Sequence, residues 1–239
     1  DLGASRALAL RELTLDAARI ATAGGNAVLA AETLRLGNYD PTRVGAQSAV
    51  TDTGTLTLNA RQLELAGKLR LEGMARAELN GLEAIQLAGV TTGLVRPVGE
   101  LNAVADLAFH GAIVAPTTYT QYSIQAPGQR VSFTRSTDTP TQPISALGSL
   151  TVVAQDIVQD GNVWAPFGQI DFRARESLTF KSGSLSSVAA APGSLTPFGK
   201  VLNGRTWVYD VDSANVPAGQ LEQTELAEKS IRMSGKNVD

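Results

Sequence analysis

The sequence predicts an all-β chain that folds as a parallel β-solenoid, in which short strands wind in stacked coils. A motif with the pattern x-L-T-[LV]-x-A-x-x-[LI]-x-x-x-G occurs three times without a gap, at 12–24, 55–67 and 149–161. The copies begin 43 and 94 residues apart, which fits about two and four units of roughly 20–24 residues. No hairpin signal separates the units, so parallel stacking is the expected arrangement.

The third copy of the motif distinguishes strands from helices. The second copy also fits a helix, because Leu56, Ala60 and Leu63 are spaced i, i+4 and i+7. The third copy reads SLTVVAQDIVQDG, with valine and isoleucine at positions where the second copy has leucine and alanine. Such β-branched side chains are stiff and fit a pleated strand better than a helix. The repeat therefore favours strands.

Alternation along the second copy predicts which side chains face the core. Successive side chains of a strand point to opposite faces, so the leucines form one face and the polar residues the other. The residues expected inside are Leu56, Leu58, Leu63 and Leu65, and those expected outside are Thr57, Arg61 and Glu64. Residues 75–89 repeat the motif with one extra residue in the turn.

The whole chain, 1–239, is expected to form a single solenoid segment of a longer protein, because it begins and ends within repeat-like stretches. Three stretches lack the alternation and are rich in turn-forming or small polar residues. We expect these three to leave the solenoid as loop or strand excursions, at about 38–54, 116–148 and 184–220. In the second of them, four prolines argue against central strands of a tight ladder.

Composition excludes several classes of function. The net charge is −3 and the pI is about 5.3, so no basic surface is expected for nucleic acid. The chain has no cysteine, which excludes thiol chemistry, and no apolar run of 18 residues, so no transmembrane segment is expected. A charged content of only 18% and few aromatic residues fit coils filled with leucine, valine, isoleucine and alanine.

Two stretches carry a family resemblance beyond the repeat itself. They are SLTVVAQDIVQDGNVWAPFGQIDF with SGSLSSVAAAPGSLTPFGKVLNGRTWVYD within 149–210, and IVAPTTYTQYSIQAPGQRVSFTRS at 113–136. The chain resembles the filamentous-haemagglutinin-like exoproteins of Gram-negative bacteria, the passengers of two-partner secretion. These segments are similar to an uncharacterised conserved region toward the C-terminal part of such proteins.

The resemblance implies a right-handed parallel β-helix that is secreted to the bacterial cell surface through an outer-membrane two-partner-secretion transporter. It implies a role in adhesion, biofilm formation or contact-dependent inhibition, with a host or bacterial surface receptor or glycan as partner. It assigns no residue role in this region. We therefore expect a structural rod segment of a surface adhesin, with no enzymatic activity, cofactor or bound metal.

Two other functions stay open from the residues. A carbohydrate-active β-helix enzyme would use acids and bases clustered on one outer face. The candidates are Asp156, Asp160, Asp171, Arg173, Arg175 and Glu176. A receptor-binding module formed by the excursions would use their aromatic side chains as a contact platform, although these could equally anchor the excursions. The candidates are Tyr119, Tyr122, Trp207 and Tyr209.

The remaining motifs favour ordinary structural interpretations. His110 is the single histidine and lacks a G-x-S-x-G partner motif, so we expect a structural role near the turn at Gly111. The glycine-rich stretch 193–201 is one residue too long between its glycines for a phosphate-binding loop. Asp210 and Asp212 have a spacing that could hold calcium, but the glycine-rich calcium repeat is missing.

Overall fold

The computed structural model describes residues 10–22, 24–40, 42–45, 53–91, 96–137, 139–190, 200–202, 206–213, 216–224 and 228–239. Within these ranges the chain is all-β and contains no helix. One sheet has 16 strands and a second has three. Every strand pairing in the large sheet is parallel, whereas the three-stranded sheet is antiparallel.

The strands of the large sheet are β1 (Glu12–Asp16), β2 (Arg19–Ala21), β3 (Ala27–Ala30), β4 (Thr33–Asn38), β5 (Thr55–Glu72), β6 (Arg76–Ala88), β7 (Val98–Ala103), β8 (Asp106–Gly111), β9 (Val114–Pro116), β10 (Gln121–Arg135), β11 (Ser149–Asp160), β12 (Asn162–Trp164), β13 (Gln169–Phe180), β14 (Leu185–Ser187), β18 (Ser230–Ser234) and β19 (Asn237–Val238). The antiparallel sheet consists of β15 (Lys200–Leu202), β16 (Thr206–Ser213) and β17 (Val216–Gln223). It shares no strand pairing with the large sheet.

The register of the large sheet resolves into three parallel ladders. Ladder I contains 27–30, 55–60, 76–81, 106–111, 130–135, 156–160, 177–180 and 237–238. Ladder II contains 12–16, 33–38, 62–67, 84–88, 114–116, 162–164 and 185–187. Ladder III contains 19–21, 68–72, 98–103, 121–126, 149–154, 169–174 and 230–234.

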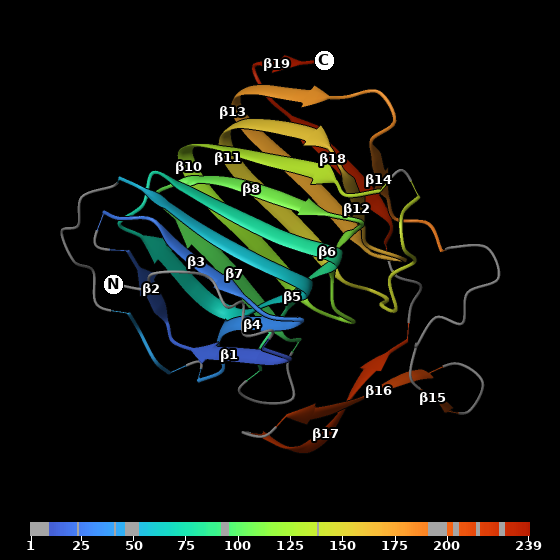
Figure 1. Cartoon of the computed structure of the whole chain (residues 1–239). Coiled ribbons are helices and arrows are strands. Elements are labelled where there is room, and N and C mark those ends of the chain that lie inside the picture. Colours follow the sequence, from blue (N-terminus) through green and yellow to red (C-terminus); the bar gives the residue numbers. More distant parts are fainter. Residues whose placement is uncertain are drawn as a thin grey trace.

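The chain visits the ladders in rotation, from I to II to III and back to I. The long strand β5 shows this directly, because its successive parts pair in ladders I, II and III. Strands therefore stack in approximate chain order, from blue β1 and β4 at one end to orange β13 at the other (Figure 1). The carboxyl-terminal strand β19 lies at the far end of this stack.

Two interruptions each replace one strand of the rotation. After β4 the chain passes from ladder II to ladder I without a ladder III strand, and 39–40, 42–45 and 53–54 carry no strand. After β10 it passes from ladder I to ladder III, and 136–137 and 139–148 carry no strand. The neighbouring ladder strands close the gap by pairing directly, as Val163 does with Val114.

The expected excursion at 116–148 is too broad and needs correction. Residues 121–135 form β10, which lies inside the large sheet and pairs with β7, β8 and β11. The prolines misled the prediction because none of them lies in the middle of a paired stretch: Pro116 is the last residue of β9, and Pro140 and Pro143 lie in 139–148, which carries no strand. Pro127 lies in the register shift between Ala126 and Arg130, where no ladder pair is formed. A proline at that position removes no hydrogen bond of the sheet.

The expected excursion at 184–220 begins later than predicted. Residues 185–187 form β14, which pairs with β12 in ladder II. Further along, β15 and β16 form strands of the separate antiparallel sheet, and β17 extends that sheet beyond residue 220. The stretch 191–199 lies outside the described residues.

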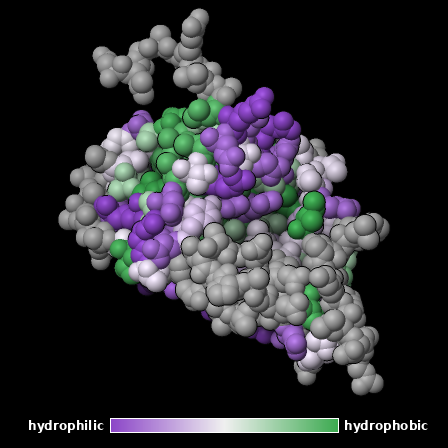
Figure 2. All heavy atoms as spheres, turned by 90° about the horizontal axis from the view of Figure 1, so that it is seen from below, coloured by the Kyte–Doolittle hydropathy of each residue, from purple (hydrophilic) through white to green (hydrophobic). Residues whose placement is uncertain are grey.

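The core is a continuous column of apolar side chains enclosed by the three ladders. Phe133 pairs in register with Phe109 and is fully buried, and the two rings stack with centroids 5.1 Å apart. Phe172 lies 6.1 Å from Phe133 and a further 6.1 Å from Phe180. Apolar residues also reach the surface, and Figure 2 shows hydrophobic areas beside hydrophilic ones on the side seen from below.

The predicted inward face of the second motif copy is confirmed. Leu56, Leu58, Leu63 and Leu65 are at most 2% exposed. Arg61 is exposed, and Thr57 and Glu64 are half-buried on the outer surface. The extra residue predicted in the turn of 75–89 is also confirmed, because two residues of β6 stand opposite one of β5 between the pairs Ala60–Gly81 and Gln62–Ala84.

Candidate polar groove on ladder III

A groove with a volume of about 320 Å³ runs along the outer surface of ladder III. It crosses β7, β10, β11, β13 and β18, which are neighbours in the sheet. Its outward-facing lining forms two columns in register. The first column is Val98, Gln121, Ser149, Gln169 and Ser230, and the second is Ser123, Thr151, Asp171 and Arg232, with Arg173 two residues beyond Asp171 on β13.

The strand alternation explains why these polar side chains meet. The residues between them in each strand, such as Leu150 and Ile170, are buried in the core, so their neighbours must point outward. Parallel pairing then places each outward residue beside its counterpart on the next strand, about 4.8 Å away. The groove is therefore a direct consequence of the ladder register.

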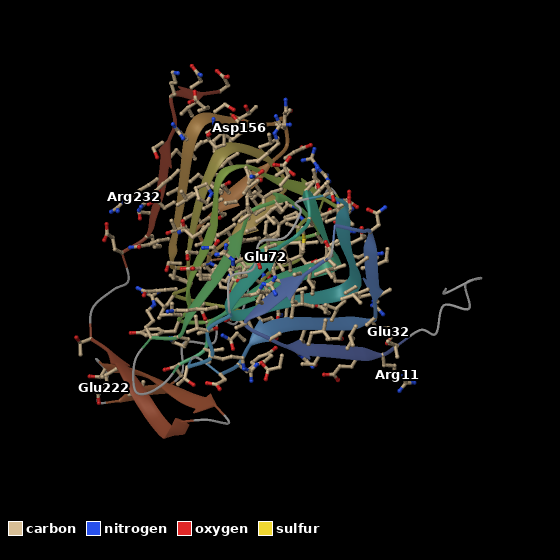
Figure 3. All side chains as sticks on the ribbon, turned by 90° about the vertical axis from the view of Figure 1, so that its left-hand side faces the viewer. Arg11, Glu32, Glu72, Asp156, Glu222 and Arg232 are labelled. Atoms are coloured by element: carbon tan, nitrogen blue, oxygen red, sulfur yellow. The ribbon has the colours of Figure 1, made fainter. Side chains whose placement is uncertain are left out.

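Each charged group of the groove has an oppositely charged partner nearby. Both Nε and Nη2 of Arg173 donate to Oδ2 of Asp171, at 2.9 and 2.6 Å. These hydrogen bonds raise the pKa of Arg173 above its ordinary value. Arg232 lies 3.7 Å from Glu228, in an exposed pair. Figure 3 shows Arg232 on the outer side of the stack, away from the core. The groove thus carries little surplus charge.

A column of strained backbone borders the groove at the corner between ladders II and III. Tyr119, Leu147 and Phe167 all have positive φ, at 61°, 62° and 54°. They come two residues before Gln121, Ser149 and Gln169. The amide of Leu147 donates to Pro166 O at 2.9 Å, and the amide of Tyr119 donates to Ala146 O at 2.8 Å. These hydrogen bonds hold the three residues in a stack with left-handed backbone conformation, which residues other than glycine rarely adopt.

Two cations reinforce this corner. Arg96 lies over the Tyr119 ring at 5.1 Å, and its Nε donates to Tyr119 O at 2.8 Å. The guanidinium also donates to Leu147 O, and burial lowers the pKa of Arg96. Lys229 lies over the Phe167 ring at 5.7 Å. Arg96 therefore joins two turns that are far apart in the sequence.

The aromatic contact platform that the sequence left open is not formed by Tyr119 and Tyr122, the two candidates whose side chains the structure describes. Tyr122 is 2% exposed and belongs to the core, so its side chain cannot contact a partner, and that prediction is wrong. Tyr119 is half-buried beneath Arg96 and anchors the turn. Trp207 and Tyr209 lie in β16, but their side chains are outside the described part of the structure. Room for the Tyr122 ring comes from Gly99 on the adjacent strand, where a Cβ would lie 2.4 Å from it.

The six charged candidates for the alternative enzymatic function are spread over more than one outer face. Asp171 and Arg173 lie in ladder III, whereas Asp156 and Asp160 lie in ladder I. Figure 3 shows Asp156 and Arg232 on different sides of the stack. Glu176 pairs with Lys236 at 3.3 Å at a corner, where Arg175 is also exposed. The described residues of the groove thus contain one carboxylate, Asp171, whereas glycosidases usually need two.

The other sequence motifs lie away from the groove. His110 points outward from β8 in ladder I, and its Nδ1 lies 3.2 Å from Thr134 Oγ1 on β10. Among the described residues, no three carboxylate, histidine or cysteine side chains converge on one point. The side chains of Asp210 and Asp212 and the stretch 193–199 lie outside the described residues.

Sequence reasoning named Asp171 and Arg173 but missed the uncharged polar residues that line the groove. Serine, threonine and glutamine at strand positions look like ordinary solvated residues when each strand is considered alone. The available signal was the alignment of 121–126 with 149–154 and 169–174, which places polar residues opposite one another. Reading that signal requires the pairing of β10 with β11, which the proline-rich composition concealed.

No family model, curated protein or solved structure matches this chain. In the described part of the chain, no helix has the length and apolar character needed to cross a bilayer.

Proposed function

We propose that this chain is a structural rod segment of a large secreted bacterial surface exoprotein, folded as a right-handed parallel β-helix. The supporting observation is the rotation of successive strands through three parallel ladders around one continuous core. A stack of this kind gains length by adding coils, and each coil contacts mainly its neighbours. It provides rigidity and reach without requiring a catalytic centre.

The family that the sequence resembles gives this rod its setting. We propose export through an outer-membrane two-partner-secretion transporter, followed by display at the cell surface. There the rod would hold adhesive or contact-delivery parts of the protein at a distance, in adhesion, biofilm formation or contact-dependent inhibition. A receptor or glycan on a host or bacterial cell is the corresponding partner. The chain has no cysteine, so it can fold after export through its strand pairing alone, with no disulfide to form.

A coil deletion tests the β-helix architecture. Leu178 occupies the same ladder position as Ile157, one coil further on. Removing residues 157–177 joins Asp156 to Leu178 and deletes one coil in register, so a solenoid should remain folded. The control removes 157–167, which joins ladder I directly to the start of a ladder III strand. We expect the first variant to keep a β-sheet circular dichroism spectrum and protease resistance, and the control to lose both.

The opposite result would favour a sheet closed as a barrel with a set number of strands. Such a barrel has no removable coil, so both deletions would abolish folding. Surface display is tested separately, with antibodies against this chain on intact cells of the bacterium that encodes it. Labelling should depend on the partner transporter gene. Labelling that survives loss of every such transporter would contradict the proposed export route.

A further inference from the structure

We propose that the polar groove on ladder III binds an uncharged linear oligosaccharide, with the sugar chain lying along the stack axis across β10, β11, β13 and β18. The proposal depends only on the register of ladder III and stands independently of the rod function. The groove volume of about 320 Å³ is at the lower end of the range typical of small-molecule sites. Unlike most such sites, its outward lining is mainly polar, so the ligand must be hydrophilic.

The backbone beneath the groove is already satisfied, which excludes one common mode of recognition. β10, β11 and β13 each pair with strands on both sides in ladder III. A peptide therefore cannot add to this surface as a further strand, because strand addition requires a free sheet edge. Recognition must instead use the outward side chains.

Those side chains have unused hydrogen-bonding capacity suited to hydroxyl groups. Within the described part of the chain, the side chains of Gln121, Ser123, Ser149 and Thr151 make no hydrogen bond. Hydroxyl and amide groups both donate and accept, as sugar hydroxyls do. Each successive strand of ladder III presents such polar side chains about 4.8 Å further along the stack, a spacing comparable to the length of one sugar ring.

The charge balance favours an uncharged ligand. The carboxylate of Asp171 is neutralised by Arg173, and Arg232 has Glu228 beside it. A polyanion would require a surplus of free cations, which this balance does not offer. The Asp171–Arg173 pair still presents charged donors and acceptors, and hydrogen bonds to charged groups are stronger than neutral ones.

The strained corner supplies rigidity to the site. Tyr119, Leu147 and Phe167 hold the first residues of β10, β11 and β13 in fixed positions. Positive φ in a bulky residue costs free energy and persists only where surrounding contacts enforce it. A preorganised lining loses little side-chain and backbone freedom when a ligand binds.

The test is a nuclear magnetic resonance titration of the full chain with cellohexaose, maltohexaose and chitohexaose, and with a polygalacturonate oligomer as the polyanion. We expect at least one neutral hexasaccharide to shift the amide signals of 121–125, 149–153 and 169–173. Thr151→Trp fills the groove and should weaken that binding at least tenfold. Thr179→Trp is the matched control, because Thr179 is also half-buried and outward-facing, but lies in ladder I.

Each outcome bears on the proposal. Binding that is lost in Thr151→Trp and kept in Thr179→Trp, with both variants folded by their amide spectra, supports the groove. The proposal is overturned if no neutral hexasaccharide binds, if Thr151→Trp binds as well as the parent, or if only the polyanion binds. If Thr151→Trp does not fold, Gln121→Ala with Ser149→Ala replaces it, and unchanged affinity in that double variant overturns the proposal.

Discussion

Replacing Phe133 by alanine is the sharpest test of the enclosed core. Its ring is fully buried, stacks on Phe109 at 5.1 Å with an interplanar angle of 19°, and lies 6.1 Å from Phe172. The three rings come from β8, β10 and β13, on successive levels of the stack and on two ladders. Removing the middle ring leaves a cavity that its neighbours cannot fill without moving the strands.

The expected loss of unfolding free energy follows from this packing. Phenylalanine to alanine in a core typically costs about 3–5 kcal/mol. Each aromatic pair adds about 0.5–1.5 kcal/mol beyond burial, so we expect Phe133→Ala to lie at the upper end of that range. Ser132→Ala is the matched control, because Ser132 precedes Phe133 on the same strand and faces outward, half-buried. It should change stability by less than about 0.5 kcal/mol.

Urea denaturation measures the total effect and amide hydrogen exchange locates it. If the chain forms the proposed β-helix, stability is a sum over neighbouring coils, so protection should fall most in β8, β10 and β11 and least in β1 to β4. A loss below about 1 kcal/mol would show that Phe133 does not lie in an enclosed core. An equal loss of protection in every strand would contradict the coil-by-coil stack.

Three further perturbations follow from the packing. Gly99→Ala should lower the free energy of unfolding by about 1–3 kcal/mol in urea denaturation, because the new Cβ would lie 2.4 Å from the Tyr122 ring. Gly25→Ala is the control: its Cβ meets nothing within 4 Å, so it should be neutral or slightly stabilising. Tyr122→Phe should stabilise by about 1 kcal/mol, since the buried hydroxyl has no partner within the described structure. Burial raises the pKa of Tyr122, so its phenol ionises more readily in the unfolded chain than in the folded one. The free energy of unfolding of the parent should therefore fall as the pH rises above about 10, and it should fall more steeply than that of Tyr122→Phe. Equal pH dependence of the two unfolding free energies above about pH 10 would contradict this. Glu72→Gln should cost about 2–3 kcal/mol by thermal or urea unfolding, because the 3% exposed carboxylate pairs with two arginines, while Glu83→Gln at an exposed pair should change little.

Local chemistry was enough to predict the strands and their inward face. Alternation in TLTLNARQLELAG and the β-branched residues of SLTVVAQDIVQDG depend only on neighbouring side chains, so one sequence carries both signals. The burial of Leu56, Leu58, Leu63 and Leu65 confirms this reasoning. A parallel pairing was also predictable, since no hairpin turn separates the repeats.

The position of each repeat copy in the stack was not predictable from the sequence. The motif describes a strand, a corner and a second strand, and this unit can occupy any two consecutive ladders. The first copy begins in ladder II, the second in ladder I and the third in ladder III. The spacings of 43 and 94 residues therefore do not correspond to whole numbers of rotations through the three ladders. The described residues 39–40, 42–45 and 53–54 carry no strand where the chain skips ladder III, so the distance along the chain does not count levels in the stack.

The candidate site depends on the tertiary structure in the same way. The sequence placed Tyr122 in an expected excursion, and only the pairing with β7 shows that its ring turns inward over Gly99. The sequence by itself determined that Gln121, Ser149 and Gln169 are polar, but not that they form one column. The alternation within a strand decides whether a side chain points inward or outward. Its neighbours on the outer surface depend instead on the register between strands that are far apart in the chain. That register is set by the packing of the whole core.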